Sequence, residues 1–181
     1  MWNSKKLIDI LEKTSETFLK EQLDFLLSGV SERSWYTPFI LYLKNIIEKN
    51  KITGYYIDTE YNRNNGKIKT VYDNSKFEVI PITCDIIVHS RGKNICKDNL
   101  ICIEMKKSTA KLKDKQSDKK RLELLTRKSF DNVWSADGKC LPEHVCGYEL
   151  GVYYEININN RSSHIEYYQN GVKIIEKNNK F

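Results

Sequence analysis

The chain lacks any apolar run of the roughly 20 residues that a membrane-spanning helix needs. Its first ten residues, MWNSKKLIDI, also lack the apolar region of a signal peptide. The sequence has no internal repeat and no linker rich in proline, glycine or serine. We therefore expect a cytoplasmic protein without a membrane partner, whose 181 residues form one domain around one core.

The cysteines are odd in number and unevenly spaced. Five cysteines, an odd number, argue against a disulfide framework, and Cys84 and Cys102 lie in apolar runs where core positions are expected. A structural zinc site is disfavoured because the remaining candidates lack the tight pair of cysteines two residues apart. These candidates are Cys96, Cys140, His144 and Cys146.

Positive charge is concentrated in one segment. The formal net charge is +6, yet residues 106–128 alone hold ten basic and three acidic residues, a balance of +7. A lysine run is usually a solvated helix face. Nucleic acid is the partner that would use such a segment beside a phosphate site.

Residues 82–107 carry the most specific chemistry of the chain. Asp85 precedes a short β-branched run, and Glu104 and Lys106 close a second run. Side chains alternate along a strand, so Glu104 and Lys106 share one face while Ile101, Ile103 and Met105 share the other. If the two runs pair as antiparallel strands, Asp85 lies beside Glu104.

Two adjacent carboxylates repel each other unless a cation separates them, and a hard divalent ion accepts their oxygens. A lysine at the same edge can orient a water or stabilise charge on a phosphate. The chemistry indicated is metal-assisted hydrolysis of a phosphodiester. In the alternative interpretation, Asp85 makes a backbone hydrogen bond, and Glu104 and Lys106 form an ordinary exposed strand face.

The order of several motifs resembles one branch of the PD-(D/E)XK nuclease superfamily. The resemblance covers roughly residues 31–156 and departs at Cys84, where a proline is common, and at Pro38, inside the helix that should carry Glu32. Its pieces are Ser31-Glu32-Arg33, Glu60-Tyr61-Asn62-Arg63, Asp85 to Gly92, Ile103 to Ser108, Leu122 to Thr126 and Tyr148 to Gly151.

This resemblance implies an α/β, restriction-endonuclease-like fold, with a mixed central sheet flanked by helices. Residues 1–30 would be a helical addition, 31–156 the nuclease-like core and 157–181 a C-terminal hairpin. It also implies that Asp85, Glu104 and the Met105 carbonyl bind Mg²⁺ or Mn²⁺, that Lys106 positions the attacking water, and that Glu32 completes the acidic cluster.

The implied substrate is nucleic acid, with DNA favoured over RNA. The residues expected along its path are Lys107, Lys119, Lys120, Arg121, Tyr61 and Arg63. The competing interpretation is a binding module that keeps the fold without cleavage. A regulatory subunit acting through the N-terminal helices and a homodimer also stay open.

The position of Glu32 has two interpretations. At about 100° per residue it falls on the apolar stripe of a helix running to Ile47, where a carboxylate needs a reason. Alternatively, Thr37 and Pro38 start that helix, leaving Glu32 in a preceding turn.

The remaining elements are expected from local patterns. Helices are indicated at 7–11, 18–27 and 117–127, and loops at 111–117 and 129–146. Strands are indicated at 55–61, 67–72, 79–89, 100–106 and 148–156. A hairpin is expected at 164–176, where Asn170-Gly171 suits a type I′ turn.

Overall fold

The structure is a computed structural model, and it describes residues 4–61, 63–64, 67–68, 70–73, 78–81, 83–128 and 146–181. The side chains of 63–81 lie outside this description. The helices are α1 (Ser4–Glu21), α2 (Leu23–Leu27), α3 (Glu32–Lys49) and α4 (Leu112–Thr126), with a short 3₁₀ turn at Ile95–Lys97. No helix in the described part of the chain is long and apolar enough to cross a membrane.

A six-stranded mixed sheet forms the centre of the molecule, in the order β1-β6-β7-β8-β9-β10. Neighbouring strands are antiparallel except for the parallel pair β7 and β8. Its strands are β1 (Tyr56–Thr59), β6 (Ile86–His89), β7 (Asn99–Lys107), β8 (Leu150–Asn157), β9 (Ser162–Gln169) and β10 (Val172–Lys180). Two small hairpins accompany it: β2 (Arg63–Asn64) with β3 (Lys67–Ile68), and β4 (Thr70–Asp73) with β5 (Glu78–Pro81).

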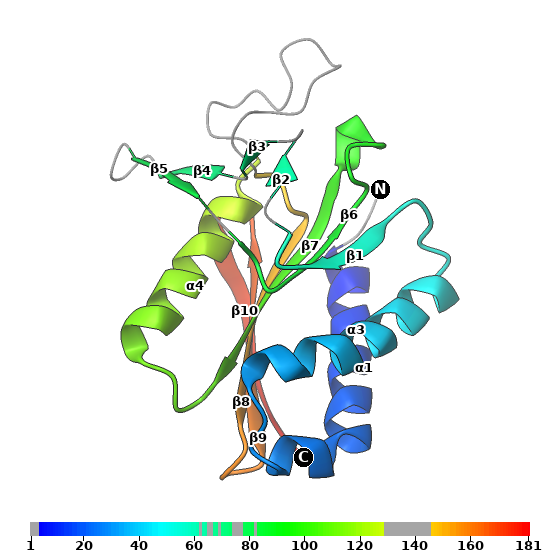
Figure 1. Ribbon diagram of the computed structural model, residues 1–181. Coiled ribbons are helices and arrows are strands. Elements are labelled where there is room, and N and C mark those ends of the chain that lie inside the picture. Colours follow the sequence, from blue (N-terminus) through cyan, green and yellow to red (C-terminus); the bar gives the residue numbers. More distant parts are fainter. Residues whose placement is uncertain are drawn as a thin grey trace.

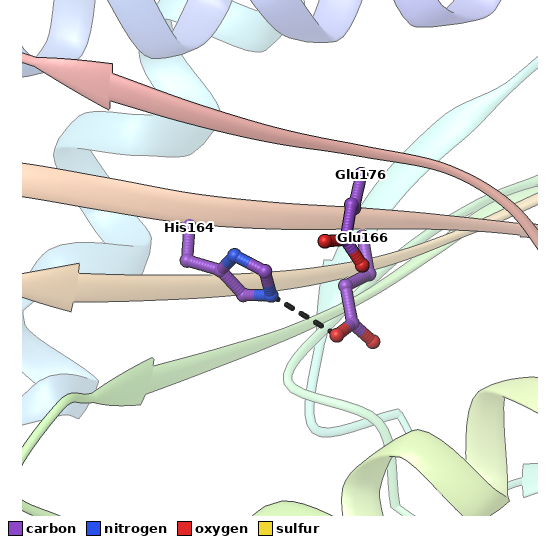
Figure 2. A group of neighbouring side chains, drawn as sticks. All are labelled: His164, Glu166 and Glu176. Carbon is purple, nitrogen blue, oxygen red and sulfur yellow. Dashed lines mark hydrogen bonds and ion pairs between the residues drawn. The ribbon is translucent and has the colours of Figure 1, made fainter.

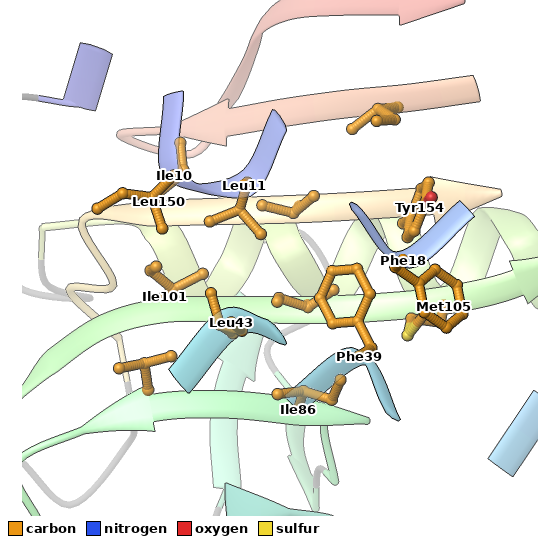
Figure 3. Close-up of a cluster of buried hydrophobic side chains, with 14 of the residues drawn as sticks. Ile10, Leu11, Phe18, Phe39, Leu43, Ile86, Ile101, Met105, Leu150 and Tyr154 are labelled. Carbon is orange, nitrogen blue, oxygen red and sulfur yellow. The ribbon is translucent and has the colours of Figure 1, made fainter. Parts of the chain in front are cut away.

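The sheet is covered on both faces, with α1 and α3 on one side and α4 on the other (Figure 1). The larger core lies under α1 and α3, and Figure 3 shows side chains of both helices against β6, β7 and β8. On α1, Leu7, Leu11 and Phe18 are buried at helical spacing, which explains why this helix docks. The α/β class expected from the sequence is therefore confirmed.

Helix α3 runs from Glu32 through Pro38 without a break, so the alternative in which Pro38 begins the helix is wrong. A proline inside a helix costs about 3 kcal/mol. Burial of Trp35, Phe39 and Leu43 on the same stripe outweighs this cost. Glu32 is therefore the first residue of the helix.

The single strand expected at 67–72 is wrong, because Lys67–Ile68 pairs with β2 and Thr70–Asp73 pairs with β5 in a separate hairpin. Three other expected boundaries are also wrong. Residues 7–27 form the long helix α1 and then α2, because residues between the two expected helices continue the buried stripe. Residues 79–89 are two separate strands, since Glu78–Pro81 pairs with β4 and only Ile86–His89 joins the central sheet.

The third wrong boundary is the start of α4. The helix begins at Leu112, so the loop expected at 111–117 is mostly helical. Its first turns have no apolar stripe, but lysine and glutamine are good helix formers. Lys115 also stabilises the start of α4, because its Nζ donates to the Ser108 carbonyl at 2.7 Å and lies 3.0 Å from Glu155 Oε2.

The C-terminal hairpin agrees with its prediction. Strands β9 and β10 pair in antiparallel register, and Asn170 and Gly171 have φ of 53° and 82°, as a type I′ turn requires. The loop expected at 129–146 lies outside the described residues except for Cys146.

Candidate active site

Asp85 and Glu104 lie beside each other. Strands β6 and β7 are antiparallel with Ile86 opposite Ile103, so Asp85, just before β6, lies next to Glu104 on β7. Asp85 Oδ2 accepts a hydrogen bond from the Met105 backbone N–H at 2.8 Å. The expected pairing of the two runs is confirmed.

Glu32, at the start of α3, reaches the end of β7 close to Asp85 and Glu104. Its Oε1 accepts a hydrogen bond from the Lys107 backbone N–H at 2.7 Å, and its Oε2 lies 3.8 Å from Lys106 Nζ. The start of α3 therefore brings a third carboxylate to the end of β7. The structure thus joins Glu32, Asp85, Glu104 and Lys106, the residues predicted from the sequence.

Helix α4 adds two residues to this group. Asp118 Oδ2 lies 2.8 Å from Lys106 Nζ, and Arg121 Nε donates to Glu104 Oε1 at 2.6 Å. Asp118 and Arg121 also pair with each other one helical turn apart. We call the full set the acidic site; its members are Glu32, Asp85, Glu104, Lys106, Asp118 and Arg121.

Sequence reasoning missed Asp118. It is buried on a helix whose other polar residues are mostly solvated. The available signal was spacing: within the expected helix 117–127, Asp118, Arg121, Leu122 and Leu125 already fall on one face.

Burial strongly affects the charges of the acidic site. Burial raises the pKa of Asp85, against hydrogen bonds from Tyr36 and the Met105 backbone that lower it. Glu104 is 1% exposed, and burial raises its pKa well above the ordinary value, with nearby Asp85 acting in the same direction. Burial lowers the pKa of Lys106, but its pairing with Asp118 outweighs this effect and the net pKa is raised.

The ionised acidic site carries excess negative charge. Four carboxylates face one lysine and one arginine, which leaves a formal charge of −2. Two hollows of the protein lie elsewhere, one beside Lys97 and Tyr148 and one beside Leu19 and Phe181. The acidic site itself is covered by α4.

The residues expected along a nucleic acid have varied surroundings. Lys107 Nζ lies over the Trp35 ring and donates to the Gly29 carbonyl. Lys119 Nζ pairs with Glu166 at 2.8 Å, and Lys120 Nζ pairs with Glu123 at 3.3 Å.

Tyr61 packs against the His89 ring, with a centroid distance of 4.8 Å. Arg63 lies on β2, and its side chain is outside the described residues. Of the predicted nucleic-acid residues, Arg121 is therefore the one in contact with the acidic site through its side chain. Its partners there are carboxylates.

A second cluster of potential metal ligands was not expected. His164, Glu166 and Glu176 project toward one another from β9 and β10 (Figure 2). Its three potential ligand atoms all lie within 4.8 Å of one another, and among the described residues the acidic site does not form such a group. There, Arg121 pairs with Glu104 and Asp118, and Lys106 pairs with Asp118 and lies 3.8 Å from Glu32.

Charge distinguishes this cluster from the acidic site. Lys119 and Lys173 both lie next to Glu166 Oε1, and Lys173 also pairs with Glu176. Burial raises the pKa of Glu166, but the hydrogen bonds from Lys119 and other neighbours outweigh it and bring the value to about 2. The two carboxylates are matched by two lysines, so this cluster has no charge deficit for a cation to fill.

The cysteines occupy different environments. Cys84 and Cys102 are buried in the core beneath α4, as expected from their apolar runs. Cys96 is exposed and Cys146 is buried. The disfavoured zinc ligands Cys140 and His144 lie outside the described residues.

Comparison with known proteins gives no match. No protein-family model fits the chain, and no curated protein or solved structure is significantly similar to it. The fold defines a mixed α/β protein with a six-stranded sheet, and its acidic site is partly buried at the end of β7. The resemblance to PD-(D/E)XK nucleases rests on the motif residues alone.

Proposed function

We propose that this protein is a divalent-metal-dependent nuclease with a restriction-endonuclease-like fold, related to the PD-(D/E)XK superfamily. One observation carries the proposal: residues from α3, the start of β6, β7 and α4 converge on a partly buried group in which four carboxylates outnumber two cations. Structural ion pairs usually balance, because unpaired buried charge is costly.

The residues present fit Mg²⁺ or Mn²⁺. Asp85 and Glu104 offer carboxylate oxygens and the Met105 carbonyl is adjacent in sequence, a set of hard ligands suited to these ions. The raised pKa of both acids means that burial outweighs the stabilisation that neighbouring donors and cations give to their ionised forms, so a further cation would favour ionisation. When bound, a divalent ion supplies charge stabilisation to a phosphate and makes a bound water more acidic.

Lys106 acts as a fixed positive charge. Its raised pKa keeps Nζ protonated near neutral pH, so it donates hydrogen bonds and does not accept a proton. Asp118 at 2.8 Å and Glu32 at 3.8 Å hold the ammonium group at the end of β7. From there it can orient an attacking water or stabilise charge on the phosphate.

The proposed substrate is nucleic acid, with DNA before RNA. Lys111 and Lys113 are exposed at the start of α4, in the segment of +7 charge that follows the acidic site. A polyanion is attracted to such a surface, and the attraction weakens with salt.

A binding module without catalysis is the second candidate. Its support is the pairing of Arg121 with Glu104 and of Lys106 with Asp118, which offsets part of the acidic charge without a metal. Such a protein would bind nucleic acid, and its affinity would not depend on divalent ions.

Incubation of the purified protein with labelled DNA and RNA, in Mg²⁺, Mn²⁺ or EDTA, tests the proposal. We expect cleavage with either ion and none in EDTA. Binding without cleavage of any substrate would favour the second candidate.

A further inference from the structure

Helix α4 holds the acidic site through two crossed ion pairs. Arg121 contacts Glu104 at 2.6 Å, and Asp118 contacts Lys106 at 2.8 Å. Arg121 and Asp118 also bind each other. One turn of α4 therefore supplies the Arg121 cation to Glu104 and the Asp118 anion to Lys106.

The guanidinium of Arg121 donates a hydrogen bond to Glu104 Oε1, an oxygen that a metal ion would need as a ligand. Glu104 is almost fully buried, so its Oε1 has few alternative partners. A divalent ion at Glu104 therefore competes with Arg121 for the same charge. Loss of a proton from Arg121 cannot relieve this competition, because arginine stays protonated in proteins.

Arg121 can reach a new partner, however. Its side chain is 23% exposed, so its outer edge meets solvent. A planar guanidinium binds phosphate oxygens through two parallel hydrogen bonds, with geometry similar to its pairing with a carboxylate. Asp118 keeps its own contact with Lys106 when Arg121 turns away, so the lysine stays in place.

We propose that Arg121 couples the binding of substrate and metal: a backbone phosphate of the nucleic acid draws Arg121 away from Glu104, which frees that carboxylate for the divalent ion. This inference rests on the proposed function. Coupling of this kind is reciprocal, so the metal strengthens nucleic-acid binding by the same factor. In the absence of nucleic acid, Arg121 suppresses metal binding.

Calorimetric titration with Mn²⁺ tests the coupling in the full-length protein, with and without a phosphorothioate DNA duplex that resists hydrolysis. For the wild type we expect the duplex to tighten Mn²⁺ binding by about tenfold or more. In Arg121→Gln we expect tighter Mn²⁺ binding without DNA, and little further change when DNA is added. Arg161→Gln is the matched control, because Arg161 is exposed on the turn before β9; it should behave as the wild type.

The outcomes separate this inference from the proposed function. Equal coupling in Arg121→Gln and the wild type, or no coupling in the wild type, would overturn the role of Arg121 while leaving the metal site intact. If the wild type binds no Mn²⁺ under either condition, the proposed function fails as well. Should Arg121→Gln not fold, as judged by circular dichroism, Arg121→Lys replaces it: the lysine keeps the charge but cannot bridge two partners, so coupling should fall.

Discussion

At the scale of the residue, Asp85 is held between opposing effects. The Met105 backbone N–H and the Tyr36 hydroxyl stabilise its ionised form, yet burial dominates and raises its pKa. At a pH between the ordinary pKa and the raised pKa, the folded protein keeps the Asp85 proton, whereas the unfolded chain has already released it. Ionisation of Asp85 therefore opposes folding in the metal-free protein.

Asp85→Asn should show this as a change in the pH dependence of stability. The wild type loses stability from this group as pH rises from the ordinary pKa of about 4 toward the raised value, and the variant does not. We expect the variant to gain stability relative to the wild type as pH rises above about 4. Urea denaturation over this range measures the difference, with Asp24→Asn on the exposed face of α2 as control. A difference that stays constant with pH would contradict the role of burial.

In the proposed metal site, Lys106 differs from the carboxylates, because it would supply charge and no metal ligand. Lys106→Met keeps the stem of the side chain and removes the ammonium group. Turnover should fall by about 10²–10⁴-fold while Mn²⁺ still binds. Single-turnover cleavage and calorimetry measure the two effects separately, and loss of Mn²⁺ binding in this variant would show that Lys106 organises the metal site itself.

At the scale of the element, α4 is placed by a close approach to β8. A Cβ added at Gly151 would lie 2.8 Å from Thr126 Cγ2 and 3.2 Å from Tyr168 Cβ. Gly151 thus lets the end of α4 rest directly on the sheet, and the same helix carries Asp118 and Arg121 to the acidic site.

Gly151→Ala should destabilise the protein by about 1–3 kcal/mol, because the added methyl group overpacks this contact. Thr126→Ser removes the methyl group in the way and keeps the hydroxyl that donates to the Leu122 carbonyl. The double variant should therefore be more stable than the sum of the two single changes indicates. Strict additivity in urea denaturation would show that this contact does not set the helix position.

The exposed start of α4 is the part of the basic segment that is open to a polyanion. Lys115, Lys119 and Lys120 are paired with acidic residues, whereas Lys111 and Lys113 are exposed. The exposed pair at the start of α4 is well placed to release counterions from a phosphate backbone without breaking internal contacts.

Changing Lys111 and Lys113 together to alanine should weaken nucleic-acid binding and reduce its salt slope by about 1 to 2. Mn²⁺ binding at the acidic site should stay the same. The control replaces Lys44 and Lys49 on α3, which removes equal charge from the opposite side of the sheet. If both pairs give the same binding and salt slope, the start of α4 is only a solvated helix face.

At the scale of the whole molecule, the acidic site depends on both layers of helices. Glu32 comes from α3 on one face, Arg121 and Asp118 from α4 on the other, and Asp85 and Glu104 from the sheet between them (Figure 1). No single supersecondary unit contains the full group.

This arrangement explains what the sequence could predict. Alternation and short spacing were enough to predict the pairing of Asp85 with Glu104 and the hairpin turn at Asn170, because both are local. The start of α4 depends on long-range contacts such as Lys115 with Glu155, so local periodicity misplaced it. Asp118 is buried because α4 packs against β7 and β8, which spacing within the helix does not reveal by itself.

The central claim is that the acidic site, and not the cluster of His164, Glu166 and Glu176, performs metal-dependent cleavage. The most direct measurement is the rate of nucleic-acid cleavage in Mn²⁺ for the wild type, Glu104→Gln and His164→Gln. Glu104→Gln should fall by about 10³-fold or more, since a ligand of a phosphate-bound metal is worth several kcal/mol in the transition state. His164→Gln should cleave at nearly the wild-type rate. Cleavage that survives in Glu104→Gln but is lost in His164→Gln would contradict the account.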